Sequence, residues 1–142
     1  MWRTRRLTRG GNLKTHTLRR AGGGLLATRV ALVHTGRVVR LLLAADTGSL
    51  YTIIEPAFLT ALDIDPARAV AHVEIAGIGG QLHVPRVTVE RLHCFGQTLS
   101  AVQVLTLDFS HILPSIHGLL GFRELRVSQA TIDVVRHVVT IP

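Results

Sequence analysis

Short apolar segments separated by glycine-containing turns run along most of this chain. Leu25–His34 is largely apolar and ends at Thr35-Gly36, which predicts a strand followed by a turn. Two further apolar runs, at 38–45 and 51–55, have the length of buried strands. Pro56 then stands where a helix can begin, and the apolar segment 57–62 fits one short helix.

The second half of the chain repeats this pattern. Strands are predicted at 69–77, 81–92, 99–107, 130–134 and 137–141, and a short helix at 122–127. The turns between them include Gly77-Ile78-Gly79-Gly80 and Phe95-Gly96-Gln97, whose glycines permit positive φ values. Many short strands with one or two short helices indicate an all-β fold, a small closed barrel or sandwich.

Composition agrees with one folded unit. The 142 residues suffice for one domain, and 47% of them are hydrophobic. No run of 18 apolar residues occurs, so we expect no membrane span. Cys94 is the only cysteine, which excludes intrachain disulfides and fits a reducing compartment, so we expect a cytoplasmic protein with Cys94 packed in the fold.

The positive charge is concentrated at the N-terminus. Residues 1–20 hold seven of the sixteen Lys and Arg and no acidic residue, whereas nine Arg and nine acidic residues balance in 21–142. We therefore expect a disordered basic tail at 1–22 and a folded domain at 23–142. A nucleic-acid or anionic-surface arm at 1–20 is a less favoured alternative, and a processed leader is another.

One carboxylate stands out at the end of a buried strand. Leu41-Leu42-Leu43-Ala44-Ala45 delivers Asp46 into the turn Thr47-Gly48-Ser49. A carboxylate in that setting is costly unless it is hydrogen-bonded or performs chemistry. Asp46 is therefore the first candidate for a functional residue.

Four features in order resemble the retropepsin-like aspartic proteases, and the similarity spans about residues 25–142. The sequence Leu-Leu-Leu-Ala-Ala-Asp-Thr-Gly-Ser at 41–49 is followed by an apolar strand and short helix at 51–62. A glycine-tipped hairpin at 77–80, with Val-Pro-Arg-Val after it, resembles the flap of that family. Ile-His-Gly-Leu-Leu-Gly at 116–121 resembles the apolar element through which the active-site loop threads.

The resemblance implies an aspartic endopeptidase that uses no cofactor. Two carboxylates sharing one proton can activate a water and protonate the leaving amine. This chain has one Asp-Thr-Gly, and its other aspartates lack the following Thr-Gly or Ser-Gly. A homodimer would supply the second Asp46 from another copy, on a two-fold axis.

The family pattern also assigns roles to neighbouring residues. Thr47 would hydrogen-bond across the axis, Gly48 would let substrate approach, and Ser49 would bond the outer carboxylate oxygen. The flap residues that would close over a polypeptide substrate are Ile78, Gly79 and Gly80. The residues of the loop-threading element are Gly118, Leu119, Leu120 and Gly121.

Two positions depart from the family, and other function classes find less support. Retroviral members often carry an acidic residue where this chain has Leu50. Many relatives have Asp where this chain has His117, and we expect His117 to pack in the loop. The eight histidines form no close ligand pair, so no metal site is predicted. A peptide-binding or dimerisation module of the same fold, without turnover, remains the alternative to an enzyme.

Overall fold

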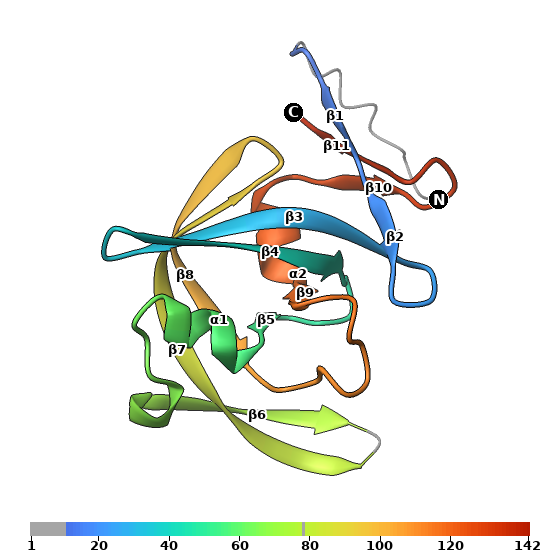
Figure 1. Cartoon of the computed structure of the whole chain (residues 1–142). Helices are drawn as coiled ribbons and strands as arrows, with labels where there is room; N and C mark the ends of the chain where they lie inside the picture. The colour runs from blue at the N-terminus through green and yellow to red at the C-terminus, as the bar shows by residue number, and fades with distance from the viewer. Residues whose placement is uncertain (1–10, 78) are drawn as a thin grey trace, which may run out of the picture.

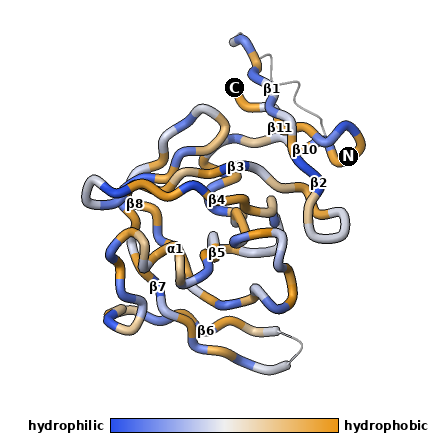
Figure 2. Tube along the Cα trace, viewed as in Figure 1, coloured by the Kyte–Doolittle hydropathy of each residue, from blue (hydrophilic) through white to orange (hydrophobic). Residues whose placement is uncertain are grey.

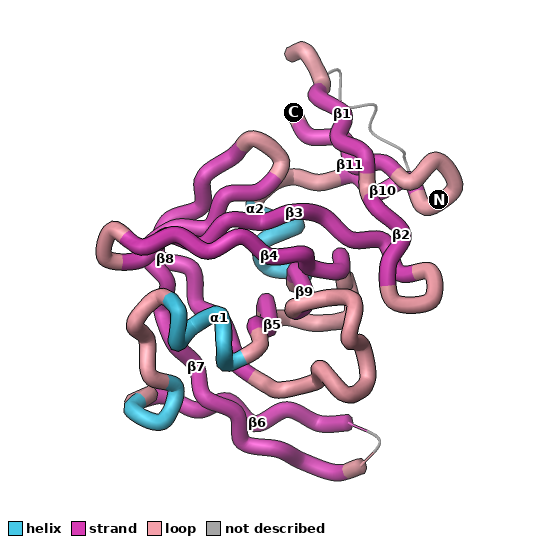
Figure 3. Tube along the Cα trace, in the orientation of Figure 1, coloured by secondary structure: helices cyan, strands magenta, loops and turns pink. Residues whose placement is uncertain are grey.

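Strands make up most of the computed structural model, which describes residues 11–77 and 79–142 (Figure 3). The first part of the chain forms β1 (Lys14–Thr17), β2 (Arg19–Ala21), β3 (Leu25–His34), β4 (Arg37–Ala45), β5 (Thr52–Ile54), α1 (Pro56–Ala61) and the 3-10 helix η1 (Pro66–Arg68). The remainder forms β6 (Ala71–Gly77), β7 (Gly80–Cys94), β8 (Gln97–Thr106), β9 (Gly118–Leu120), α2 (Phe122–Val127), β10 (Thr131–Asp133) and β11 (Val138–Ile141). The all-β class expected from the sequence is confirmed.

The strands form two sheets. The larger has the order β2-β3-β4-β9-β5-β8-β7-β6, and because β3 also pairs with β7, six of its strands form a ladder that returns to its start. The smaller sheet has the order β1-β11-β10. It lies at the opposite end of the molecule from the β6–β7 hairpin (Figure 1).

The uninterrupted apolar run of β4 is explained by burial on both faces. Leu41 and Leu43 belong to the main core, whereas Ala44 packs in a second cluster with Ile53 and Leu105. Apolar residues accordingly follow the central strands β3 and β4 in Figure 2. A strand that is buried on both faces has no solvent-exposed face, so its sequence lacks the alternation of apolar and polar residues that is typical of strands exposed on one face.

The short helices lie where proline and glycine allow them to begin. Pro56 opens α1, where the absent N–H removes no helical hydrogen bond, and Leu59 is the buried residue of that helix. Gly121 precedes α2, whose bounds match the predicted helix. Within the described residues no helix has the length and apolar character needed to cross a membrane.

The N-terminal segment differs from the expected tail. Lys14–Thr17 pairs with β11, and Arg19–Ala21 pairs with β3, although both were assigned to disordered sequence. Leu18, between the two strands, is 3% exposed and packs in the core. One buried leucine and backbone pairing to the distant C-terminus therefore order a segment whose charge predicted disorder; residues 1–10 lie outside the description.

Candidate active site

The Asp46 carboxylate lies directly after β4, in a loop tied back to its own backbone. The Asp46 N–H donates to Leu120 O (2.9 Å), which extends the parallel pairing of β4 with β9 by one bond. Asp46 Oδ1 accepts the Gly48 N–H at 2.9 Å. A Cβ on residue 48 would stand 3.2 Å from that oxygen, so glycine gives the carboxylate its room.

The hydroxyl groups of the loop are directed differently. The Ser49 hydroxyl donates to Tyr51 O at 2.7 Å, instead of the bond to the carboxylate that the family pattern implied. The Ser49 N–H closes the turn on Asp46 O at 3.3 Å. Thr47 is exposed. Asp46 itself is half-buried, so its carboxylate can be reached from solvent.

Residues 118–121 form the neighbouring strand β9 and the residue that precedes α2, and they lie against the loop. β9 lies between β4, with which it is parallel, and β5, with which it is antiparallel. A Cβ on Gly118 would overlap the Ile53 carbonyl oxygen, and one on Gly121 would lie 2.6 Å from Thr52 N. Both positions therefore require glycine because the backbones are in contact.

The loop is also fixed at its far end by the first amides of α2. Phe122 N–H donates to Ser49 O at 2.6 Å, and Arg123 N–H donates to Leu50 O at 3.3 Å. The Gly121 N–H donates to the buried Thr52 hydroxyl at 2.9 Å. The Asp46 loop is thus bonded to one continuous segment, 120–123.

His117 joins this framework through both its backbone and its ring. Its Nδ1 accepts the Leu42 N–H at 2.9 Å, and its own N–H donates to Leu42 O at 2.8 Å. The ring also lies against Phe58 of α1, with centroids 4.6 Å apart. The bond to Nδ1 assigns the ring proton of a neutral imidazole to Nε2. His117 therefore anchors β4 four residues before Asp46, which is more than the packing role expected.

The hairpin expected to act as a flap is present as β6 and β7. Gly77 pairs with Gly80 at its tip, and Gly80 has φ +114°, which favours glycine. Gly79 and Gly80 are exposed, and Ile78 lies outside the described residues. In the view of Figure 1 this tip and the loop after β4 lie on the same side of the molecule.

Comparison with protein families gives a match to the aspartyl protease model over residues 30–123, which contain the Asp46 loop and the Gly-Leu-Leu-Gly segment. The chain belongs to the aspartyl protease family. Its fold is similar to that of a retropepsin-like aspartic protease from Rickettsia conorii, with a TM-score of 0.69 and 14% identity over 92% of this chain and 91% of that one. The resemblance to retropepsin-like proteases is confirmed.

A protease of Simian Foamy Virus (mac) is a more distant match, with a TM-score of 0.48 and 18% identity over 70% of this chain and 91% of that protein. A comparison with curated protein sequences gave no match.

Two cavities flank Thr47 in this family member. One of about 670 Å³ is lined by Leu25, Leu26 and Val134 together with Arg20 and His137. The other, of about 370 Å³, lies between the loop and α2 and is lined by Phe122, Leu125, Arg126 and residues 129–132. The candidate active site therefore opens onto concave, largely apolar surface on both sides.

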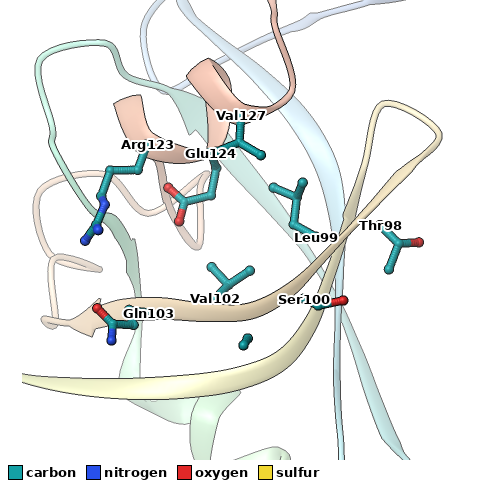
Figure 4. Close-up of a pocket in the computed structure, with 9 residues that line it drawn as sticks. Thr98, Leu99, Ser100, Val102, Gln103, Arg123, Glu124 and Val127 are labelled. Atoms are coloured by element: carbon teal, nitrogen blue, oxygen red, sulfur yellow. The ribbon is translucent and has the colours of Figure 1, made fainter.

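A buried carboxyl beneath α2 was not found by sequence reasoning. Glu124 and Val127 extend from α2 toward Leu99 and Val102 of β8 (Figure 4). Glu124 is only 7% exposed, and within the described chain its Oε2 has no hydrogen-bond partner. Burial raises the pKa of Glu124 above its ordinary value, and a hydrogen bond from Thr52 opposes that shift. No pattern around Glu124 distinguishes it from a surface helix residue, so the sequence carries no signal for it.

Proposed function

We propose that the protein is an aspartic endopeptidase whose catalytic pair is Asp46 and the Asp46 of a second copy. The observation that carries the proposal is the Asp46 carboxylate itself. It is half-buried and oriented by the Gly48 amide, in a loop that β9 and α2 hold in place. The family match over this segment supports protease chemistry.

The chemistry needs two carboxylates close together. Like charges about 3 Å apart cannot both ionise, so such a pair shares one proton. The ionised member takes a proton from water as the water attacks the peptide carbonyl. The protonated member gives its proton to the leaving amine. One chain supplies one Asp-Thr-Gly loop, so a symmetric dimer completes the pair.

The surface beside the loop supports this assembly. Leu50, directly after the turn, is 59% exposed, and Phe122, whose amide bonds the turn, is 42% exposed. Together with the exposed Thr47, these residues are called here the margin of the loop, and Thr47 and Phe122 line the same cavity. A second copy docking on the two-fold axis would cover this margin and bring the two Thr47 hydroxyls together.

An extended polypeptide is the substrate that this arrangement suits. Ile78, Gly79 and Gly80 at the hairpin tip would close over the chain, as in the flap of retropepsin-like proteases, and offer backbone hydrogen bonds. The cavities on either side of Thr47 would receive alternate side chains of the peptide. Closure would exclude bulk water from the scissile bond.

Asp46→Asn tests the proposal, with Asp63→Asn as its matched control. Both changes replace a carboxylate by an amide, but Asp63 lies in an exposed turn with φ +63°, which Asn tolerates well. We expect cleavage of an unfolded protein substrate to fall at least about a hundredfold in Asp46→Asn and to persist in Asp63→Asn. Wild-type activity should rise more than linearly with concentration near the dimer dissociation constant.

Sedimentation at the same concentrations checks the dimer directly. Cleavage by Asp46→Asn at the wild-type rate, or by wild-type protein that sediments as a monomer, would contradict the shared pair. Absence of cleavage in a dimer that binds a statine-type transition-state mimic only weakly would favour the non-catalytic module.

A further inference from the structure

A second concave site lies on the outer face of the large sheet, away from Asp46. The cavity has a volume of about 480 Å³ and lies where β3 and β4 run beside the β7–β8 turn. Two arginines line it, Arg29 of β3 and Arg40 of β4, together with His93 and Thr98. Arg40 precedes Asp46 by six residues of extended strand, which is roughly 20 Å. The cavity is thus separate from the candidate active site.

Strand register brings the basic side chains to one face. Ala31 of β3 pairs with Arg40 on one side and with His93 on the other. Arg29 is two residues before Ala31 on the same strand, so it shares that face and lies diagonally across from Arg40. The small Ala31 side chain leaves the space between these groups open.

The arginine charges at this site are not compensated. Within the described residues the one ion pair joins Arg68 and Asp65 on an exposed turn, far along the sequence from this face. Residues 1–10 and 78 contain no Asp or Glu, so they hold no carboxylate side chain that could pair with these arginines. Arg29 and Arg40 are both exposed, and their guanidinium donors are available to an anion.

Further polar groups line the same cavity. His93 Nδ1 and Thr98 Oγ1 are 2.8 Å apart, which fixes the orientation of the imidazole ring. The turn that joins β7 to β8 supplies Gly96 and Gln97 to the same wall. The cavity is thus lined by two arginines, by hydrogen-bonding groups of β7, β8 and their turn, and by the apolar residues Val30, Ala31 and Phe95.

We propose that this cavity binds the phosphate group of a phosphorylated ligand. A phosphomonoester carries nearly two negative charges at neutral pH and has three acceptor oxygens. Two arginines can bind two of its edges while the opposite wall bonds the third oxygen. A carboxylate has one charge and two oxygens and leaves one arginine unpaired. This proposal does not depend on the peptidase chemistry at Asp46.

The direct test is calorimetric titration with inorganic phosphate at about pH 7.5, where the second ionisation of phosphate groups is largely complete. Arg40→Gln and Arg29→Gln remove one guanidinium each. Arg37→Gln is the matched control because it makes the same charge change on β4 but does not line the cavity. We expect one saturable site that survives about 150 mM sodium chloride. Its dissociation constant should rise about tenfold or more in either cavity variant and less than about threefold in the control.

A second arm identifies the source of the phosphate. The affinity of a phosphoserine peptide is compared with that of its unmodified form, and the affinity of a mononucleotide with that of its nucleoside. The phosphorylated probe that binds more tightly shows whether a protein or a metabolite supplies the phosphate group. Peptidase activity should be unchanged in Arg40→Gln. Equal weakening by Arg37→Gln, phosphate binding no tighter than acetate binding, or no saturable site in the wild type would each overturn the proposal.

Discussion

Replacing Gly118 by alanine adds one methyl group at the most crowded backbone position near the candidate active site. The new Cβ would overlap the Ile53 carbonyl oxygen of β5 and stand 2.8 Å from Leu43 Cδ2 of β4. Carbon atoms in contact prefer about 3.5–4.0 Å, so β9 would have to move by roughly 1 Å. It cannot move freely, because β4 and β5 hold it on both sides.

The expected loss of stability follows from that crowding. Forcing a methyl group into packed structure costs about 1–3 kcal/mol. Weakened pairing between β9 and β5, at about 1 kcal/mol per hydrogen bond, adds to it. We therefore expect Gly118→Ala to lower the free energy of unfolding by about 3–4 kcal/mol. For a chain of 142 residues this corresponds to a fall in Tm of about 10 °C.

Thermal unfolding followed by circular dichroism measures this effect at one fixed protein concentration, since dimerisation would make Tm concentration-dependent. Gly77→Ala is the control, because a Cβ there has no neighbour within 4 Å and the residue has no positive φ. Its Tm should stay within about 2 °C of the wild type. A Gly118→Ala protein that unfolds at the wild-type temperature would show that β5 and β9 are not in backbone contact.

Two further predictions concern ionisable groups beneath α2. Since burial raises the pKa of Glu124, its contribution to stability is present below the unfolded-state value of 4.5 and is lost as pH rises through the higher folded-state value. The urea midpoint of the wild type should therefore fall from weakly acidic to neutral pH, and it should fall less in Glu124→Gln. An equal fall of the urea midpoint with pH in the two proteins would contradict this. Burial also raises the pKa of the Cys94 thiol to about 11. The nearby Ser128 hydroxyl lowers this pKa, and the Glu124 carboxylate raises it further. Ellman's reagent at about pH 8 should react slowly with Cys94 in the folded protein and rapidly in urea, and equal rates would exclude a buried thiol.

Most strands and the helix α2 could be predicted because their signals are local. Leu25–His34 and Phe122–Val127 were expected with the bounds the structure has. Apolar runs, a proline at a helix start and glycine at the turns suffice for such elements. Strand β9 was expected only as a family motif, because a strand of three residues that begins at Gly118 is too short to show a period.

The N-terminal strands show what local signals cannot supply. Lys14 pairs with Ile141 at the other end of the chain, and the Leu18 N–H donates to His137 O at 2.8 Å. Composition in this segment is basic and polar, so a window of sequence favours disorder. The partner strand of β1, more than a hundred residues away, and the burial of Leu18 make the ordered state favourable.

At the candidate site, the sequence predicted the loop, and the family resemblance predicted the supporting element 118–121, but neither predicted the individual hydrogen bonds. The Asp-Thr-Gly-Ser turn is local, and the Gly48 bond to Asp46 spans two residues. The hydrogen bonds that join the loop at 46–50 to Leu120, Phe122 and Arg123 span about seventy residues of sequence. The bond between Leu42 and His117 spans 75 residues, so no local motif could specify it. The Ser49 hydroxyl bonds Tyr51 O, two residues further along the chain, although the family resemblance directed it to the carboxylate.

The hydrogen bonds of the Asp46 loop also bear on how the proposed enzyme would assemble. Within the described residues, the Asp46 backbone is hydrogen-bonded to Leu120 and Ser49, and its Oδ1 to Gly48. In the proposed enzyme these bonds would orient the Asp46 carboxylate before a second copy binds. Dimerisation would then have to order little beyond the exposed margin around Thr47, which would lower the entropy cost of association. On this proposal, the pairing of β4 with β9 and the Gly48 amide, which both lie within one chain, would position the carboxylate for catalysis.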